Sequence, residues 1–252
     1  THGLIVNLLQ AYEGASISGY RRLVELVGLS HTGAGTRARL LKHARMLLRA
    51  LLGAGLVVHE KKTATSPALL RVAQGLQHNF SLNHTLSLYL VETLAALEPE
   101  KETWPLDVSS MVESILENPD VVLWAQVDAA KTEKIQQLKA QGMEYDQRME
   151  ELEKVTHPKP NAEFIYGTFD EFAKKHPWVQ HDNVRPKSVA RDLFERCMTF
   201  PEYVKEYGLQ RSEGVLLRYL SDAYKTVLQN VPETVRTETL EDIAAYLLTT
   251  IK

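Results

Sequence analysis

One segment constrains the fold more than any other part of this 252-residue chain. Residues 212–229 predict a helix that is apolar around most of its circumference. With about 100° per residue, four apolar side chains fall close to one line along this helix: Leu216, Leu220, Ala223 and Val227. Its polar side chains share one narrow strip: Arg218, Ser221, Asp222 and Lys225. A helix this apolar packs on most of its sides, so we expect a helical bundle in which the polar strip faces water, a partner or a channel.

Helical patterns with short breaks, and no strand patterns, continue through the region 83–252. The expected helices cover 83–97, 106–116, 120–155, 162–175, 186–197, 201–207, 212–229 and 237–250. The segment 120–155 is unusually long for a helix of a globular protein. This region is therefore predicted to be an all-α domain that contains one long helix or helical arm.

The long segment 120–155 carries a heptad-like seam of residues spaced by three and four: Ile135, Leu138, Gly142, Tyr145, Met149 and Leu152. Gly142 either allows another helix to approach closely or breaks the segment into two helices. Because the seam has fewer than three to four heptads, it favours an antiparallel arm that packs on its own domain. A coiled coil that binds a protein partner is the alternative.

The first 82 residues show a different order of elements. Helices are expected at 7–12, 18–27 and 36–52, with Thr36 as the N-cap of the third helix and Gly53 at its end. Two short strands, 57–60 and 69–73, then flank the polar turn 61–66. This order predicts a winged-helix domain over 1–82 with a small β wing, followed by a helical bundle over 83–252. The predicted fold class is mainly α.

The third helix of the winged-helix domain has two contrasting faces. Its apolar face consists of Leu40, Leu41, Ala44, Leu47, Leu48 and Leu51. The opposite side carries Lys42, Arg45 and Arg49. In a free-standing transcription factor, such a basic face contacts bases or phosphates of duplex DNA. An ordinary solvated face explains the same pattern equally well.

Charge is distributed unevenly along the chain. Residues 1–83 hold ten Lys/Arg against three Asp/Glu, which gives +7, whereas the remainder holds 19 against 29, which gives −10. The acidic excess argues against a broad nucleic-acid-coating surface on the helical region, although a local basic channel there is compatible with it.

The sequence contains no clear enzyme motif. The glycines of Gly33-Ala34-Gly35-Thr36 lack the lysine of a phosphate-binding loop and are better explained as a turn into a helix. His176 and His181-Asp182 fit no established metal-ligand spacing. The single cysteine, Cys197, excludes an internal disulfide, and we interpret it as a core residue. We therefore expect no catalytic residues, cofactor or metal in this chain.

Targeting features are equally sparse. Apolar runs are far shorter than the roughly 20 residues that a membrane span needs, so we expect no membrane segment and a cytoplasmic location. Because the chain does not begin with methionine, we expect it to be part of a longer protein.

The wording of several segments resembles one family. A helix ending in RCM, followed by TFPEYVKEYGL and EGVLLRYLSDAYKTVL, resembles the ratchet-helix region of Ski-family superfamily 2 (DEAD/DEAH-box) helicases. The opening THGLIVNLL resembles the element that follows the second motor domain in these enzymes. The segments SILENPDVVLW and HPKPNAEFIYGTFDEFAKKHPWV resemble the C-terminal region of unknown function in an actinobacterial branch of that family.

The resemblance implies a C-terminal accessory region of an ATP-dependent RNA or DNA helicase. ATP and Mg would belong to motor domains of the same polypeptide, which the winged helix would brace, and a single strand of RNA or DNA would pass the ratchet-type helix. Arg218 matches the arginine of the family's ratchet pattern. Lys225 stands where related repair helicases carry a stacking tryptophan, so a phosphate contact is expected there instead. The full set of candidate nucleic-acid-binding residues is Arg218, Lys225, Ser221, Arg211, Lys42, Arg45 and Arg49.

Two other classes of protein remain open at this point. The first is a stand-alone winged-helix regulator that reads duplex DNA, with the helical part serving dimerisation or effector binding. The second is an interaction scaffold built around the segment 120–155, which would bind a protein partner.

Overall fold

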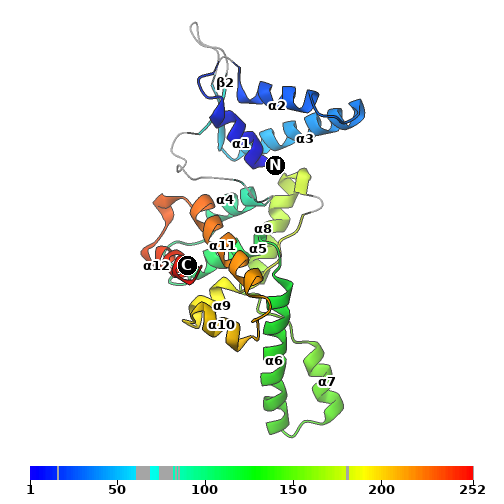
Figure 1. Ribbon diagram of the computed structural model, residues 1–252, viewed down its shortest axis with the longest axis vertical. Helices are drawn as coiled ribbons and strands as arrows, with labels where there is room; N and C mark the ends of the chain where they lie inside the picture. The colour runs from blue at the N-terminus through cyan, green and yellow to red at the C-terminus, as the bar shows by residue number, and fades with distance from the viewer. Residues whose placement is uncertain are drawn as a thin grey trace. The chain divides into compact units, whose positions relative to one another are not determined.

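The computed structural model describes the chain except residues 16, 61–68, 74–81, 83, 85, 180, 181 and 252. In the described part the protein is mainly helical and has one two-stranded sheet (Figure 1). Its contacts define two compact units. Unit 1 comprises 1–96, 167–183 and 229–234, and unit 2 comprises 97–166, 184–228 and 235–252. Each unit combines segments that are far apart in the sequence, and the domain boundary between residues 82 and 83 stays a prediction.

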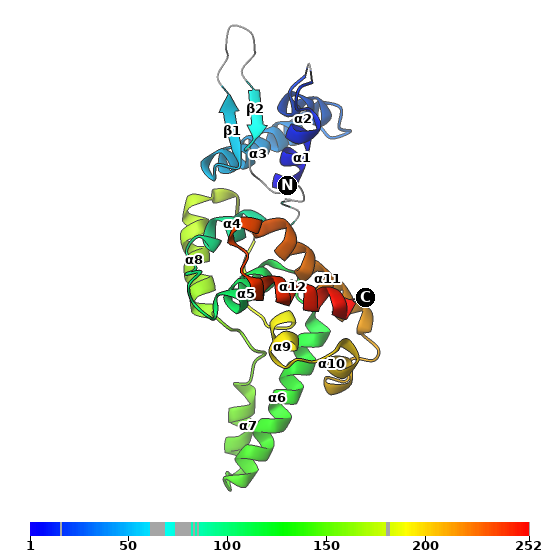
Figure 2. The same ribbon diagram turned by 90° about the vertical axis from the view of Figure 1, so that its left-hand side faces the viewer.

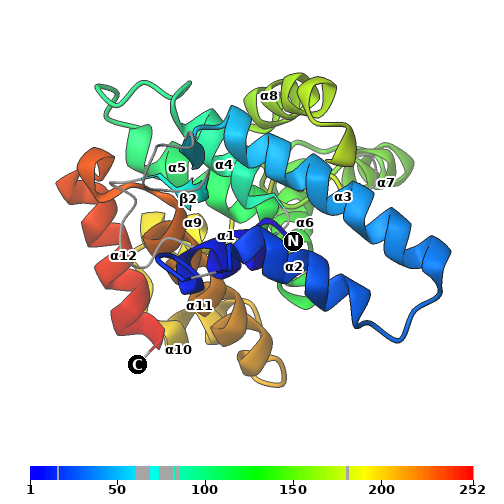
Figure 3. The ribbon, with the colours of Figure 1, turned by 90° about the horizontal axis from the view of Figure 1, so that it is seen from above.

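Unit 1 begins with three helices: α1 (His2–Ala11), α2 (Gly19–Gly28) and α3 (Ala34–Gly53). They contact one another in all three pairs, and α2 and α3 lie side by side (Figure 3). The close approach of α1 and α2 requires a glycine, because a Cβ at Gly19 would lie 2.3 Å from the backbone oxygen of Leu8. The N-cap of α3 is Gly33, so the prediction of Thr36 as N-cap is wrong and the helix starts earlier.

A two-stranded antiparallel ribbon follows the three helices (Figure 2). Strand β1 (Val57–Glu60) pairs with β2 (Leu69–Val72), with Val57 opposite Val72. Val57 is buried and Val58 is exposed, as expected for a strand with one face on a core. The predicted turn 61–66 lies outside the described residues.

The remainder of unit 1 includes α4 (Ser87–Leu94), most of α8 (Ala162–Lys175) and the 3-10 helix Pro177–Val179. Aromatic rings join these elements, and their centroids are 4.2–6.5 Å apart: Tyr89, Phe169, Phe172, His176 and Trp178. Such edge and tilted ring contacts bury large apolar areas, so this cluster forms the centre of the unit's second half.

Unit 2 contains α5 (Trp104–Ile115), α9 (Ala190–Glu195), α10 (Phe200–Glu206), α11 (Glu213–Asn230) and α12 (Glu238–Ile251), with the last residues of α11 assigned to unit 1. The helices α5, α9 and α12 contact one another around a core that includes Trp104, Met111, Leu193 and Leu247. Among the described residues, no helix is both long enough and apolar enough to cross a membrane.

Cys197 corrects one prediction from the sequence. It is exposed rather than part of the core. Helix α9 ends at Glu195, and Cys197 then adopts a left-handed conformation with φ 51°. Backbone bonds from Cys197 N to Phe194 O and from Met198 N to Leu193 O close the helix end, which turns the cysteine away from the core.

The segment 120–155 forms a helical hairpin, so the prediction of one continuous helix is wrong and the alternative of a break at Gly142 is confirmed. Helix α6 spans Asp120–Ala140 and α7 spans Tyr145–Glu153, and they run antiparallel (Figures 1 and 2). Gly142 has φ 70°, a conformation that glycine adopts without steric cost. Lys134 joins the two helices by donating to the backbone oxygen and the carboxylate of Glu151, both at 3.0 Å.

Candidate nucleic-acid interface

The first candidate surface is the basic side of α3 in unit 1. The residues of this helix include no Asp or Glu. Lys42, Arg45 and Arg49 are exposed, as predicted, and within the described residues none of the three has a carboxylate at ion-pair distance. Each charge is therefore available to an anion in solution.

The apolar side of α3 is buried only in part. Ala44, Leu47, Leu48 and Leu51 are buried, whereas Leu41 is half-buried. Leu40 is 42% exposed, so the predicted apolar face is not buried along its whole length. Burial is confined to the second half of α3, because the first turns lie beyond the residues that pack against α1 and β1.

The second candidate surface lies on α11 in unit 2. Arg218 and Lys225 are exposed, Ser221 is half-buried, and Arg211 is exposed just before the helix. The opposite side of the helix is buried through Leu216, Tyr219, Leu220, Ala223 and Val227. The predicted polar strip therefore exists, although Val215 and Leu217 also lie exposed beside it.

Ion pairs on α11 are weak. The guanidinium of Arg218 lies 3.6 Å from Glu117 and 3.9 Å from Asp222, and its side chain is 74% exposed. Exposed pairs at such distances contribute about 0–1 kcal/mol and leave the cation free to change partner. Within the described part of the chain, Lys225 has no carboxylate at ion-pair distance. The structure places Arg218, Ser221 and Lys225 together on one helix, whereas the α3 cations belong to the other unit.

A buried carboxylate that sequence reasoning missed anchors α11. Glu113 of α5 is fully buried and accepts backbone bonds from Val189 at 2.7 Å, Ala190 at 3.1 Å and Arg191 at 3.0 Å, at the start of α9. It also accepts a bond of 2.7 Å from the hydroxyl of Tyr219 on α11. Burial raises the pKa of Glu113, and the four hydrogen bonds oppose this rise because they favour the carboxylate. The sequence around Glu113 gives little signal, since its neighbours one turn earlier on α5 are the serines Ser109 and Ser110.

A buried lysine close in sequence to α9 completes this interior polar region. Lys187 is 1% exposed and donates to the backbone oxygens of Leu116 at 2.9 Å and Arg185 at 2.8 Å. Burial lowers the pKa of Lys187 to about 8. Nearby, the amide of Gln126 donates to Ser188 O at 2.6 Å. These bonds tie the segment 185–191 to α5 and α6 and so define where the bundle helices lie.

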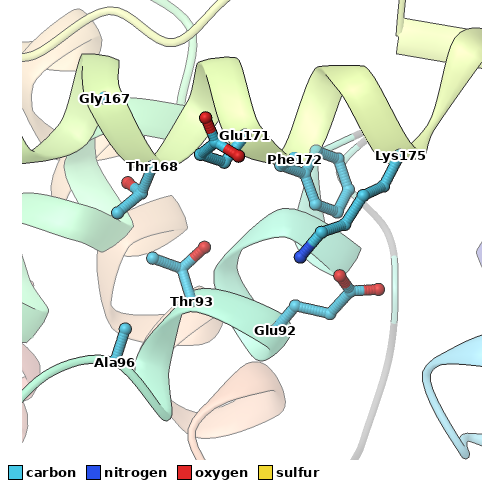
Figure 4. A pocket seen from close by; sticks show the side chains of 8 residues that line it. All are labelled: Glu92, Thr93, Ala96, Gly167, Thr168, Glu171, Phe172 and Lys175. Atoms are coloured by element: carbon cyan, nitrogen blue, oxygen red, sulfur yellow. The ribbon is translucent and has the colours of Figure 1, made fainter.

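A small pocket opens between α4 and α8 in unit 1 (Figure 4). Its volume is about 280 Å³, and its polar lining includes Glu92, Thr93, Thr168, Glu171 and Lys175. Figure 4 shows Lys175 extending toward Glu92. Most of these groups already have partners in the fold: His176 for Glu92 at 3.2 Å, Tyr89 for Thr168 at 2.9 Å and Lys174 for Glu171 at 2.6 Å. We therefore interpret this pocket as a structural feature of the α4–α8 packing.

Candidate metal-binding residues do not converge within the described residues. No group of three His, Cys, Asp or Glu side chains in the described residues has the arrangement of a metal site. His176 pairs with Glu92, and His181 lies outside the described residues. These contacts give His176 a structural role in unit 1.

Comparison with known proteins places the chain in a family. The family described as "Domain of unknown function (DUF3516)" matches residues 1–252, so the chain belongs to this family. No curated protein and no solved structure matches the chain.

Proposed function

We propose that this chain is the non-catalytic C-terminal accessory region of an ATP-dependent RNA or DNA helicase of the Ski type. In this role it braces the motor domains of the same polypeptide, in the cytoplasm, and contacts the translocating single strand through α11. ATP and Mg are bound by the motor domains. The chain itself holds no cofactor.

One observation carries this proposal. Helix α11 is buried along one face and anchored from inside by the bond between Tyr219 and Glu113, and on another face it exposes Arg218 and Lys225 on one strip. These two cations are seven residues apart, so they stand two turns and about 10 Å from each other along the axis. Two cations along one helix face suit contacts with the backbone of an extended strand. The resemblance of the segments 1–9 and 185–228 to Ski-type helicases supports the same role.

The proposal includes a winged helix in unit 1. Its support is the order of three mutually contacting helices followed by an antiparallel ribbon. In DNA-binding domains built around a helix-turn-helix, a recognition helix of this kind enters the major groove. In an accessory region, we propose that the same element braces the motor domains.

The second candidate function is a stand-alone winged-helix regulator. A specific observation favours it: Lys42, Arg45 and Arg49 are exposed on α3, a helix without acidic residues. In this alternative α3 reads duplex DNA and the helical part dimerises or binds an effector.

Salt-dependent binding distinguishes the two candidates. Fluorescence anisotropy with labelled single strands and duplexes, each over a range of salt, gives the slope of log affinity against log salt. This slope is negative, and each phosphate contact adds about 0.7 to its magnitude for single strands and about 0.9 for duplexes. We expect weak, sequence-independent binding of single strands. In the variant Arg218→Ala/Lys225→Ala, the magnitude of the salt slope should fall by about 1.4.

The control variant Lys101→Ala/Lys205→Ala removes two exposed charges elsewhere and should leave the slope unchanged. Tight, sequence-specific duplex binding would contradict the accessory role and support the regulator. In that case the variant Lys42→Ala/Arg45→Ala/Arg49→Ala should lower the magnitude of the duplex slope by about 2.7. ATP hydrolysis by the purified chain that survives repurification would also contradict the accessory role.

A further inference from the structure

A groove between α6 and α10 in unit 2 has no role in the proposed function. Its volume is about 510 Å³, within the range of ligand-binding pockets. One wall comes from α6, with Val121, Trp124, Ala125 and Asp128, and the other from the segment 206–209 at the end of α10. We call this feature the α6–α10 groove.

The α6 wall exposes a large apolar surface. Trp124 is 65% exposed, whereas the buried Trp104 of the same unit is 2% exposed. Val121 is also exposed, and the small side chains of Ala125 and Ala129 leave room beside the indole. Exposed tryptophans beside a concave surface are typical of interaction sites, because burial of an indole contributes strongly to binding.

The rim of the groove is negative. Asp128 lies one turn after Trp124 on α6, is exposed, and has no cationic partner among the described residues. On the other side, α10 ends at Glu206, Gly208 follows with φ 65°, and the carbonyl end of a helix carries partial negative charge. A cation with an apolar stem would therefore meet an apolar floor and a negative rim.

Next to the groove, the chain holds one of its own cations in the same way. The guanidinium of Arg196 lies 5.5 Å from the ring centroid of Tyr207 and pairs with Glu206 at 3.0 Å. An aromatic ring and a carboxylate thus hold one arginine of the chain itself. Trp124 and Asp128 offer the same pair of groups to an external cation, because neither is used within the described fold.

We propose that the α6–α10 groove binds a basic peptide segment of another protein. A Lys or Arg side chain of that segment stacks on Trp124 and pairs with Asp128, and a neighbouring apolar residue lies against Val121 and Ala125. Nucleic acid fits this surface poorly, since Asp128 and the helix end repel phosphates. The inference does not depend on the helicase role, because it uses none of the proposed nucleic-acid contacts.

Peptide selection tests the proposal. The purified 252-residue chain is used to select binders from a displayed library of random peptides, and selected peptides are synthesised with a fluorescent label. We expect the binders to be enriched in Lys or Arg next to an apolar residue. Their affinity should fall at least tenfold in Trp124→Ala and in Asp128→Lys. The tryptophan emission of the wild-type chain should shift to shorter wavelength on binding, and Trp124→Phe should abolish this shift.

The control variant Asp146→Lys makes the same charge change on α7 and should bind like the wild type. Melting temperatures of the Trp124 and Asp128 variants should stay close to that of the wild type, because these side chains are exposed. Asp146→Lys should lower it slightly, because Asp146 lies in the first turn of α7. The proposal is overturned if the selected peptides show no excess of basic residues or bind Trp124→Ala as tightly as the wild type. It is also overturned if a single-stranded oligonucleotide, rather than a peptide, shifts the emission of Trp124.

Discussion

Removal of the buried carboxylate of Glu113 should destabilise the bundle that presents α11. In Glu113→Ala, three backbone N–H groups at the start of α9 and the hydroxyl of Tyr219 lose their common acceptor. The donors of Val189, Ala190 and Tyr219 are buried and do not reach bulk water without local unfolding. Loss of one side of a buried charged network costs about 3–5 kcal/mol. Since domains are stable by only about 5–15 kcal/mol, this change should bring unit 2 close to unfolding.

A milder pair of variants keeps the prediction measurable. Tyr219→Phe removes one bond to a charged acceptor and should cost about 1.5–3 kcal/mol. In Glu113→Gln, the amide oxygen can take the position of the carboxylate oxygen that accepts from Val189, Ala190 and Tyr219. Its NH₂ group then faces the N–H of Arg191, so one donor is left unpaired. The free energy of unfolding of Glu113→Gln should therefore lie between those of wild type and Glu113→Ala.

Urea unfolding followed by circular dichroism gives these free energies. A double-mutant cycle adds the decisive test: Tyr219→Phe should cost less than about 0.5 kcal/mol once Glu113 is already alanine, since the bond no longer exists. The reasoning would be refuted if Glu113→Ala stayed within about 1 kcal/mol of wild type. A cost of Tyr219→Phe that is the same with and without Glu113 would refute it as well.

Three further predictions use other parts of the chain. Gly19→Ala should lower the melting temperature and cost about 3 kcal/mol or more of unfolding free energy, because its Cβ would lie 2.3 Å from a backbone oxygen of α1. The matched control is Gly28→Ala, whose Cβ would meet open space, and it should be neutral or stabilising by about 0.4–1 kcal/mol. The pKa of Lys187 falls from 10.5 to about 8 on folding. Between about pH 8 and pH 10.5, Lys187 is therefore more fully protonated in the unfolded chain than in the folded chain. The free energy of unfolding of the wild type minus that of Lys187→Met, measured by urea unfolding, should therefore rise by about 1.5 kcal/mol between about pH 8 and about pH 9.5. A difference that does not change with pH would exclude this coupling. If the proposed function holds, Arg218→Ala/Lys225→Ala in the proposed parent helicase should reduce strand unwinding severalfold while basal ATP hydrolysis and melting temperature stay unchanged. Equal unwinding would show that the strip is only a solvated face.

The sequence by itself predicted the helical character of the chain, the bundle helices and the two short strands. These features follow from local patterns: apolar residues repeat with the helical period around Leu216 and Leu220, and glycines and prolines end the helices. The buried and exposed sides of α11 also came from this period, because a helix of 18 residues shows enough turns to define a face. Local chemistry left one ambiguity at Gly142, where the same residue permits either a close packing contact or a break.

Tertiary structure decided what local patterns do not encode. The hairpin of α6 and α7 follows from the left-handed turn at Gly142 and from Lys134 meeting Glu151, two residues 17 positions apart. Cys197 is exposed because the left-handed turn after α9 carries it away from the core, and Leu40 is exposed because it lies in the half of α3 that is not buried. Glu113 and Tyr219 are 106 positions apart, and only the packing of α5, α9 and α11 brings them together. A buried charge is stable where its donors converge in space, so its site is a property of the folded chain rather than of any one segment.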